Sequence, residues 1–308
     1  MTERTPRATA VVVTYQSART IGQTMSAAQR SRDRNLLDCI VVDNGSKDAT
    51  ATILAQDFAW AGVVLTGANN GFGRGCNIGL AQVSTPYTIF INPDAVVEPE
   101  AIETMLAFLD QHPRAGIVGP AIIEGEIGGA HSLQETGERM TPAAQVRAAL
   151  PFMRRRSKTR PIEPGSPPER TGWVCGAVLM VRTDLMKRLG GFDPRFFLYW
   201  EETDICKRTE DLGFEVWALG TAVAHHVGGA SSSPADGTRI GGCIAKHYFE
   251  SRFYYMRKHH GWLAAAGAEA LEFVLLSVRT LADLARGRGA AWLRSRAQTP
   301  LFSQPDRV

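Results

Sequence analysis

The stretch that decides the fold is Thr88-Ile89-Phe90-Ile91-Asn92-Pro93-Asp94, an apolar run that ends in a short polar turn. So short an apolar run, bounded by turn-forming residues, is typical of a strand buried inside a parallel sheet. Pro93 lacks a backbone N–H and fixes its own φ, so we expect the strand to end before it. Asp94 then lies at the carboxyl end of a central strand, where open α/β sheets bind ligands.

The carboxylate of Asp94 has two interpretations at this point. With Asn92 beside it, it suits a divalent cation that bridges two phosphates, because hard cations such as Mg²⁺ take oxygen ligands. An Asp shortly before Pro99 and Ala101 is equally typical of a residue that caps a helix. The stretch alone favours neither interpretation.

Further short apolar runs alternate with helical patterns over the first half of the chain. We expect strands at residues 8–13, 40–42, 63–65, 88–91 and 118–123. A helix between the last two carries one apolar stripe of Ile102, Met105, Leu106 and Leu109. This alternation predicts an α/β fold with a Rossmann-like, mostly parallel sheet flanked by helices.

Composition describes an ordinary globular protein of 308 residues, 44% hydrophobic and 21% charged. A net charge of +3 is too small to indicate nucleic acid as a partner. The five cysteines are odd in number and contain no CxxC pair, which favours reduced thiols in a cytosolic protein over disulfides or a zinc site.

Any membrane contact is expected to be peripheral. Residues 1–8 lack the apolar stretch of a signal peptide, and the most apolar segment, residues 262–278, is interrupted by Glu269 and Glu272. A basic run at residues 154–160 lies in a Gly- and Pro-rich excursion spanning about 124–170. It is either a solvated loop or an anion-binding patch that faces phosphorylated lipid or the membrane surface.

The last third of the chain, residues 236–308, is predicted to be helical. One apolar stripe lies opposite Glu272, Arg279, Asp283 and Arg286, and it consists of Leu271, Val274, Leu275, Val278, Leu281, Ala282 and Ala285. The pattern favours docking of this stripe onto the catalytic domain over a helix that lies on a membrane.

Polar turns follow three of the predicted strands, at Thr14 and Tyr15, at residues 43–46, and at residues 92–94. In a parallel sheet these strand ends share one edge, so they can converge on one ligand. Asp43 there can accept a hydrogen bond from a base imide or a ribose hydroxyl. The loop from Gly71 to Gly75 permits close backbone approach, but it does not follow the first strand as a dinucleotide fingerprint would.

The second half of the chain supplies candidate catalytic groups. Glu201, Glu202 and Asp204 begin a helix directly after an aromatic run. They are either acids at a helix N-terminus, each worth about 0.3–1 kcal/mol, or crowded carboxylates with a raised pKa suited to a general base. His225 and His226 end a later strand, and one of the pair could complete a metal site.

Read in order, seven motifs resemble an inverting glycosyltransferase of family 2 with the GT-A fold, in its rhamnosyltransferase-like branch. The motifs are VVVTYQS (11–17), VVDNGSKD (41–48), NNGFGRGCNIG (69–79), NPD (92–94), GAVLMVR (176–182), GGFDPRFFLYWEETD (190–204) and HHVGGAS (225–231). No single motif is specific, but their order is.

The resemblance assigns roles to named residues. The general base falls on Glu202, with Asp204 as a rival and Glu201 beside them. The DXD motif reads Asn92-Pro93-Asp94, so only Asp94 keeps a carboxylate toward Mg²⁺ or Mn²⁺, together with His226 or His225. The donor-binding residues are Thr14, Tyr15, Asp43, Asn44, Gly71, Arg74, Asn77, Asn92 and Asp94.

The resemblance also implies substrates and an organisation. The donor is dTDP-rhamnose or a UDP-sugar such as UDP-galactofuranose, and the acceptor is a glycan linked to polyprenyl diphosphate at the cytoplasmic membrane face. The catalytic domain spans residues 1–235, with a nucleotide-binding part at 8–123 and an acceptor part at 171–235.

Two rival functions fit less well. A sugar-nucleotide pyrophosphorylase would carry a basic, glycine-rich loop after the first strand, where this chain has Thr14-Tyr15-Gln16-Ser17. A non-catalytic nucleotide-sugar-binding scaffold would not need Asp94, Glu202 and a candidate metal-binding histidine together.

Overall fold

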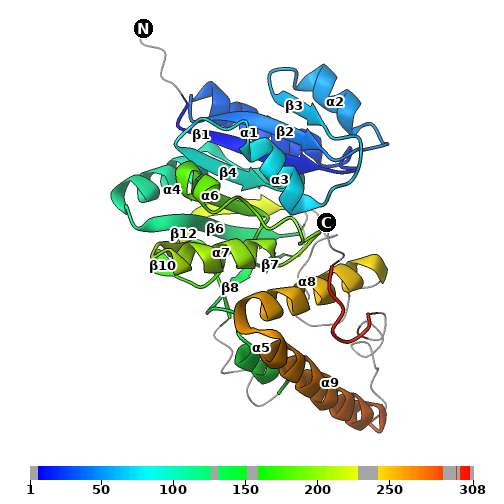
Figure 1. Ribbon diagram of the computed structural model, residues 1–308. Helices are drawn as coiled ribbons and strands as arrows, with labels where there is room; N and C mark the ends of the chain where they lie inside the picture. Colours follow the sequence, from blue (N-terminus) through cyan, green and yellow to red (C-terminus); the bar gives the residue numbers. More distant parts are fainter. Residues whose placement is uncertain are drawn as a thin grey trace. The chain divides into compact units, whose positions relative to one another are not determined.

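The computed structural model describes residues 6–125, 131–150, 159–227, 242–286, 296 and 299–305 (Figure 1). The chain forms two compact units. The first unit comprises Met1–Gly137, Arg160–Asp193 and Glu202–Ser232, and the second comprises Glu138–Thr159, Pro194–Glu201 and Ser233–Val308. The predicted domain boundary at residue 235 and residues 154–158 of the basic run lie outside the described residues.

One sheet of ten strands organises the first unit, in the order β10-β12-β6-β11-β4-β1-β2-β3, with β5 paired to β12 and β7 to β6. The strands are β1 (Ala8–Thr14), β2 (Leu37–Asp43), β3 (Gly62–Leu65), β4 (Tyr87–Ile91), β5 (Ala95–Val97), β6 (Ala115–Glu124), β7 (Ser132–Leu133), β10 (Glu169–Arg170), β11 (Val178–Arg182) and β12 (Glu215–His226). A separate pair joins β8 (Glu135–Thr136) to β9 (Arg160–Pro161).

The central strands confirm the predicted Rossmann-like sheet. β1 is parallel to both β2 and β4, β2 is parallel to β3, and β6 is parallel to β12. All five residues of β4 are buried, as the run Ile89-Phe90-Ile91 predicts. β11 differs from a purely parallel order, because it lies antiparallel between β4 and β6. β12 is one long strand, with a register shift between Leu219 and Val223.

Helices cover both faces of this sheet (Figure 1). Alternate residues of β1 point to opposite faces, so Val12 belongs to the same core cluster as Ile21 and Ile102, while Val11 belongs to that of Cys76 and Phe192. Helices α1 (Ile21–Asp33), α2 (Thr50–Asp57) and α4 (Pro99–Gln111) therefore contribute to one core cluster. Helices α3 (Phe72–Leu80), α6 (Thr183–Arg188) and α7 (Glu201–Asp211) contribute to the other.

The predicted apolar stripe of α4 is confirmed, because Ile102, Met105, Leu106 and Leu109 are all buried. Burying a side chain of this size contributes about 1.5–3 kcal/mol. The helix begins with Pro99 in its first turn, and Glu98 in extended backbone is its N-cap residue, so Asp94 is not the capping residue of this helix.

The second unit is built from α5 (Pro142–Ala149), α8 (Gly242–His260) and α9 (Trp262–Leu284). Both α5 and α8 pack on α9 (Figure 1). Its aromatic core includes Phe196, Trp200, Tyr254 and Tyr255, with the rings of Phe196 and Tyr254 edge to face at 5.0 Å. The aromatic run that precedes Glu201 in the sequence therefore belongs to this core.

The predicted apolar stripe of α9 is not the face of this helix that packs within the second unit. Leu271, Val274, Val278 and Leu281 are exposed, whereas Glu269 and Glu272 on the other face are buried. The acidic face is the one that packs, because buried arginines neutralise it. None of the described helices is both long and apolar enough to cross a bilayer.

Candidate active site

The ends of β1 and β2 bring two predicted donor-binding residues together. Thr14 and Asp43 are opposite each other in the parallel register, and both are buried. The backbone N–H of Asn44 donates to the carbonyl of Thr14 at 2.8 Å, and the N–H of Ser46 donates to Asp43 Oδ1 at 3.0 Å. Tyr15, the next residue of the turn, is exposed. The turn thus holds a carboxylate and a hydroxyl at one edge of the sheet.

Two of the predicted donor-binding amides hold backbone segments. Asn44 Nδ2 donates to the carbonyl of Gly71 at 2.9 Å. Asn77 both donates to the carbonyl of Phe192 and accepts from its N–H, each at 2.8 Å. These bonds fix the glycine-rich loop to β2 and the segment before α7 to α3.

The glycines of the 69–79 motif lie where α3 approaches β1. A Cβ on Gly75 would lie 2.6 Å from Val13 Cγ1, and one on Gly79 would overlap Val11. Gly71, at the N-terminus of α3, has φ +82°. Two of these glycines therefore permit close helix–strand packing. Arg74, also predicted to bind donor, lies on α3 and is half-buried.

Asp94 and His226 lie in direct contact. His226 Nε2 donates to Asp94 Oδ1 at 3.0 Å, and Nδ1 donates to Glu124 Oε1 at 3.2 Å. Burial alone would lower the pKa of His226, but its bonds to the two carboxylates raise it to about 9. Without a bound cation, the imidazole is therefore protonated at neutral pH.

The neighbouring histidine is placed differently. Successive side chains of a strand point to opposite faces, so His225 points away from the side on which His226 meets Asp94. The backbone adds to the contact, because the N–H of Val227 donates to the carbonyl of Asp94 at 2.8 Å. Of the two predicted metal-binding histidines, only His226 is paired with Asp94.

The Asp94–His226 pair suits a divalent cation in its donor chemistry, because a carboxylate oxygen and an unprotonated imidazole nitrogen are both common metal ligands. Among the described residues, no group of three or more acidic, His or Cys side chains is placed to hold a metal ion. Such a cation would take its remaining ligands from phosphate oxygens and water, as Mg²⁺ usually does.

Glu202 lies against the segment that precedes β11, at the same edge of the sheet as Asp94. A Cβ on Gly176 would lie 3.3 Å from Glu202 Cβ, so the two backbones pack closely. The next residue, Ala177, accepts from the N–H of Asn92 at 2.8 Å. Glu202 itself is half-buried and accepts from Thr203 Oγ1 at 3.2 Å.

The thiol of Cys175 reports the same convergence. Burial, together with the weaker effect of the carboxylates of Glu202, Glu124 and Asp94, raises its pKa to about 12. Acidic residues from three distant parts of the chain thus act on one sulfur. Glu124 and Cys175 both lie outside the seven motifs, so no sequence pattern marks them.

The other two acids of the cluster lie elsewhere. Asp204 is fully buried and accepts from Arg208 Nε at 2.7 Å. Arg208 also donates to the carbonyls of Leu189 and Gly191, so this pair braces the loop before α7. Glu201 is buried and belongs to the second unit.

Comparison with known proteins identifies the family. The model of glycosyl transferase family 2 matches residues 9–166, more than half of the chain. The chain belongs to glycosyl transferase family 2. It is therefore a glycosyltransferase, and the family match includes Thr14, Asp43 and Asp94.

Among curated proteins, this family 2 glycosyltransferase is similar to two rhamnosyltransferases. It is 27% identical to N-acetylglucosaminyl-diphospho-decaprenol L-rhamnosyltransferase of Mycobacterium tuberculosis, over 83% of this chain and 86% of the relative. It is also 27% identical to rhamnosyltransferase WbbL of Escherichia coli, over 48% of this chain and 58% of that protein.

Solved structures confirm the GT-A fold of this family 2 glycosyltransferase. The mannosyltransferase PcManGT from Pyrobaculum calidifontis, in complex with GDP-Man and Mn²⁺, superposes with a TM-score of 0.53 at 17% identity, over 96% of this chain and 80% of that chain. Staphylococcus aureus TarS with UDP has a TM-score of 0.53 at 16% identity, over 85% of this chain and 65% of that chain.

Proposed function

We propose that this glycosyltransferase moves L-rhamnose, with inversion, from dTDP-rhamnose to a hydroxyl of a glycan linked to polyprenyl diphosphate. The similarity to the mycobacterial enzyme supports the sugar and the kind of acceptor, because that enzyme is a rhamnosyltransferase named for a diphospho-decaprenol acceptor. The similarity to WbbL supports the sugar.

The observation that carries the proposal is the position of Glu202 relative to Asp94. Glu202 packs against Gly176, and the adjacent Ala177 accepts a backbone hydrogen bond from Asn92, two residues before Asp94. Inverting transfer needs a base on the acceptor side of the sugar and charge stabilisation on the diphosphate side. Two separate acidic groups at one sheet edge meet both needs.

Glu202 is the proposed general base. It is half-buried, so an acceptor hydroxyl can reach it, and its Oε takes the hydroxyl proton as the acceptor oxygen bonds to the anomeric carbon. The bond from that carbon to the diphosphate oxygen breaks in the same step, and its electron pair leaves with the nucleotide. Asp204 is the weaker candidate, since it is fully buried in an ion pair with Arg208.

Asp94 and His226 are the proposed protein ligands of a divalent cation, Mg²⁺ or Mn²⁺. A cation held there would neutralise the charge that develops on the leaving diphosphate. Glu124 positions the imidazole through its contact with Nδ1, which orients Nε2 toward Asp94. The Mn²⁺ in the PcManGT complex supports a cation in this fold, although that likeness is structural only.

The alternative donor is a UDP-sugar such as UDP-galactofuranose. Asp43 can accept a hydrogen bond from the imide N–H that thymine and uracil share, so its position does not separate dTDP from UDP. TarS binds UDP.

Thermal unfolding with a panel of nucleotide sugars tests the donor. A donor present at 100 times its Kd stabilises the folded protein by about 2.7 kcal/mol. We expect dTDP-rhamnose with Mn²⁺ or Mg²⁺ to raise Tm most, and a chelator to remove most of that shift. A larger shift with UDP-galactofuranose would select the alternative donor. No shift with any nucleotide sugar would contradict the proposal.

A further inference from the structure

The second unit exposes a long apolar surface on α9. Its large members are Leu263, Leu271, Val274, Val278 and Leu281, which we call the α9 apolar face. Leu263 is 80% exposed, Val278 62% and Leu281 65%. These residues recur at helical spacing over 18 positions, about 27 Å of helix. Other positions on that face are Gly267, Ala270, Ala282 and Ala285, all exposed and none charged.

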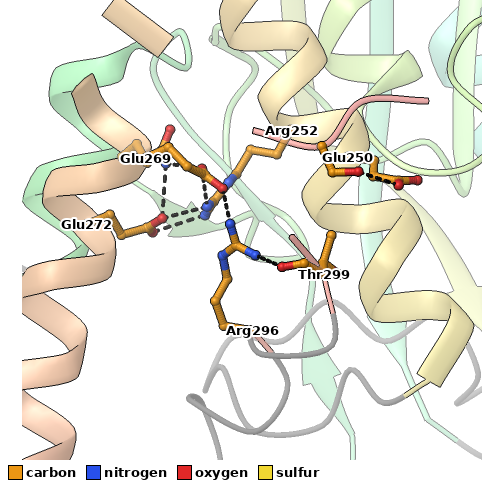
Figure 2. Close-up of polar contacts among 8 residues, drawn as sticks. Glu250, Arg252, Glu269, Glu272, Arg296 and Thr299 are labelled. Atoms are coloured by element: carbon orange, nitrogen blue, oxygen red, sulfur yellow. Dashed lines mark hydrogen bonds and ion pairs between the residues drawn. The ribbon is translucent and has the colours of Figure 1, made fainter. Parts of the chain in front are cut away.

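The opposite face of α9 is acidic and fully engaged inside the second unit (Figure 2). Arg252 of α8 donates to Glu269 at 2.9 Å and to Glu272 at 2.5 Å, and Arg296 also pairs with Glu269. Gln145 of α5 donates to both glutamates, at 3.2 and 3.0 Å. If α9 turned its apolar face inward, Glu269 and Glu272 would move away from Arg252 and Arg296. The two arginines would then be buried without their acidic partners, which is unfavourable. The exposure of that face is therefore built into the packing.

Charge is divided unevenly between the two units. The second unit contains 18 Lys and Arg against 8 Asp and Glu, a net charge of +10. The first unit contains 16 against 23, a net charge of −7. The net positive charge of the second unit attracts an anionic surface and repels the second unit of another copy.

We infer that the second unit docks on an anionic phospholipid bilayer, with the α9 apolar face inserted among the lipids at the surface. An interfacial helix of this kind buries apolar side chains in the headgroup region and keeps basic residues near the lipid phosphates. Arg279 and Arg286 border the apolar face, and Arg257 and Lys258 in the last turn of α8 lie just before it in the chain. Trp262, 54% exposed at the start of α9, is of the residue type that favours the membrane interface.

The inference deepens the proposed function, because a polyprenyl-linked acceptor would be held in that bilayer. The surface itself is argued from α9 and the charge of the second unit alone. Its test therefore needs neither donor nor acceptor, and it can fail or succeed independently of the sugar that is transferred.

Sedimentation of the full-length protein with phosphatidylcholine vesicles, with and without phosphatidylglycerol, tests the inference. We expect binding at low salt only to vesicles that contain phosphatidylglycerol, at least tenfold stronger than to phosphatidylcholine alone, and weaker as salt rises. The variant V274Q/V278Q/L281Q should lose at least tenfold in vesicle affinity. All three positions are exposed, so its Tm should match that of the wild type.

A matched control replaces exposed aliphatic side chains of the first unit. The variant V63Q/L65Q/L212Q makes the same chemical change at three exposed positions, and it should bind vesicles as the wild type does. Vesicle binding by V274Q/V278Q/L281Q at wild-type strength would overturn the inference. So would an absence of wild-type binding at low salt. A wild-type dimer that becomes monomeric in that variant, with no vesicle binding, would assign the face to a second copy instead and overturn it equally.

Transfer to a water-soluble, short-chain acceptor separates this inference from the proposed function. V274Q/V278Q/L281Q should retain wild-type turnover on such an acceptor. A protein that binds vesicles but transfers no sugar would refute the proposed function and leave the docking surface in place.

Discussion

His226 Nε2 lies 3.0 Å from Asp94 Oδ1, although 132 residues separate them in the chain. The contact forms because β5, directly after Asp94, pairs antiparallel with the end of β12, and His226 is opposite Ala95 in that register. Glu124 is opposite His226 on the other side, at the end of β6. The pairing of β12 with β5 and β6 therefore places His226 between Asp94 and Glu124, at the proposed diphosphate end of the site.

Replacing His226 by Ala should weaken cation binding. Loss of one of two protein ligands should lower the affinity for Mn²⁺ in the presence of nucleotide by about 10- to 100-fold, on the scale seen for changes at metal sites. Isothermal titration with Mn²⁺ measures this directly. His225→Ala is the matched control, because His225 points to the other face of β12, and it should leave Mn²⁺ affinity unchanged. Equal losses in the two variants would refute the assignment.

The raised pKa of His226 predicts how the metal-free protein responds to pH. Its pKa of about 9 lies above the ordinary value of 6.5. The contribution of His226 to the free energy of unfolding is therefore complete below about pH 6.5. This contribution, up to about 3 kcal/mol, is lost as pH rises through about 9. Urea unfolding in a chelator, compared with His226→Asn, measures it. A difference between the two proteins that stays constant over this range would contradict the prediction.

Cation binding should show the opposite trend. A cation needs the unprotonated Nε2 of His226, so its binding releases a proton. We expect the affinity for Mn²⁺ to rise with pH over the range in which the metal-free protein loses stability. Titration at about pH 6.5 and about pH 8.5 checks this, and a falling affinity would contradict it.

Gly75 should not accept a side chain. A Cβ there would lie 2.6 Å from Val13 Cγ1 in the packed layer between α3 and β1, so Gly75→Ala should destabilise the fold by about 1–3 kcal/mol. Gly22 on α1 is the matched control, because a Cβ there meets nothing within 4 Å. Gly22→Ala should stabilise by about 0.5–1 kcal/mol. Urea unfolding measures both, and a Gly75→Ala variant as stable as Gly22→Ala would refute the packing argument.

The buried network of the second unit should be sensitive to the loss of one partner. Arg252→Met removes a positive charge that neutralises the buried carboxylates of Glu269 and Glu272. The free energy of unfolding should therefore fall by about 3–5 kcal/mol. Arg7 pairs with Asp110 on the surface, so Arg7→Met should cost no more than about 1 kcal/mol. Tryptophan fluorescence during urea unfolding can follow both variants. Equal costs would show that burial of the network has no energetic consequence.

Local patterns were sufficient to predict the strands β1, β2, β3, β4 and β6 and the helix α4, but not the short strands β5, β7 and β10. The run Ile89-Phe90-Ile91 before Pro93 marked the central strand and its end, and the stripe on α4 marked a buried helix face. The spacing of apolar residues and the turn-forming residues beside them indicate the type and ends of an element from a few neighbouring positions. The direction of β11 was not predictable in this way, because its sequence fits a buried strand in either direction.

The long-range partners of the site needed the structure. Nothing near Glu124 signals that it contacts His226, which is 102 residues away, because that contact depends on the register of β6 against β12. The periodicity of α9 revealed an apolar face but not which face packs. The acidic face packs because Arg252 and Arg296 neutralise it, and these arginines lie 17 and 27 residues from Glu269 in the sequence.

The central claim is that Glu202 takes the proton of the acceptor hydroxyl, and Glu202→Gln tests it most directly. The measurement is kcat for sugar transfer together with the Kd of the nucleotide sugar, with Glu210→Gln on the same helix as the control. We predict a 10²- to 10⁴-fold fall in kcat with donor Kd unchanged for Glu202→Gln, and wild-type values for Glu210→Gln. Wild-type kcat in Glu202→Gln would contradict the claim.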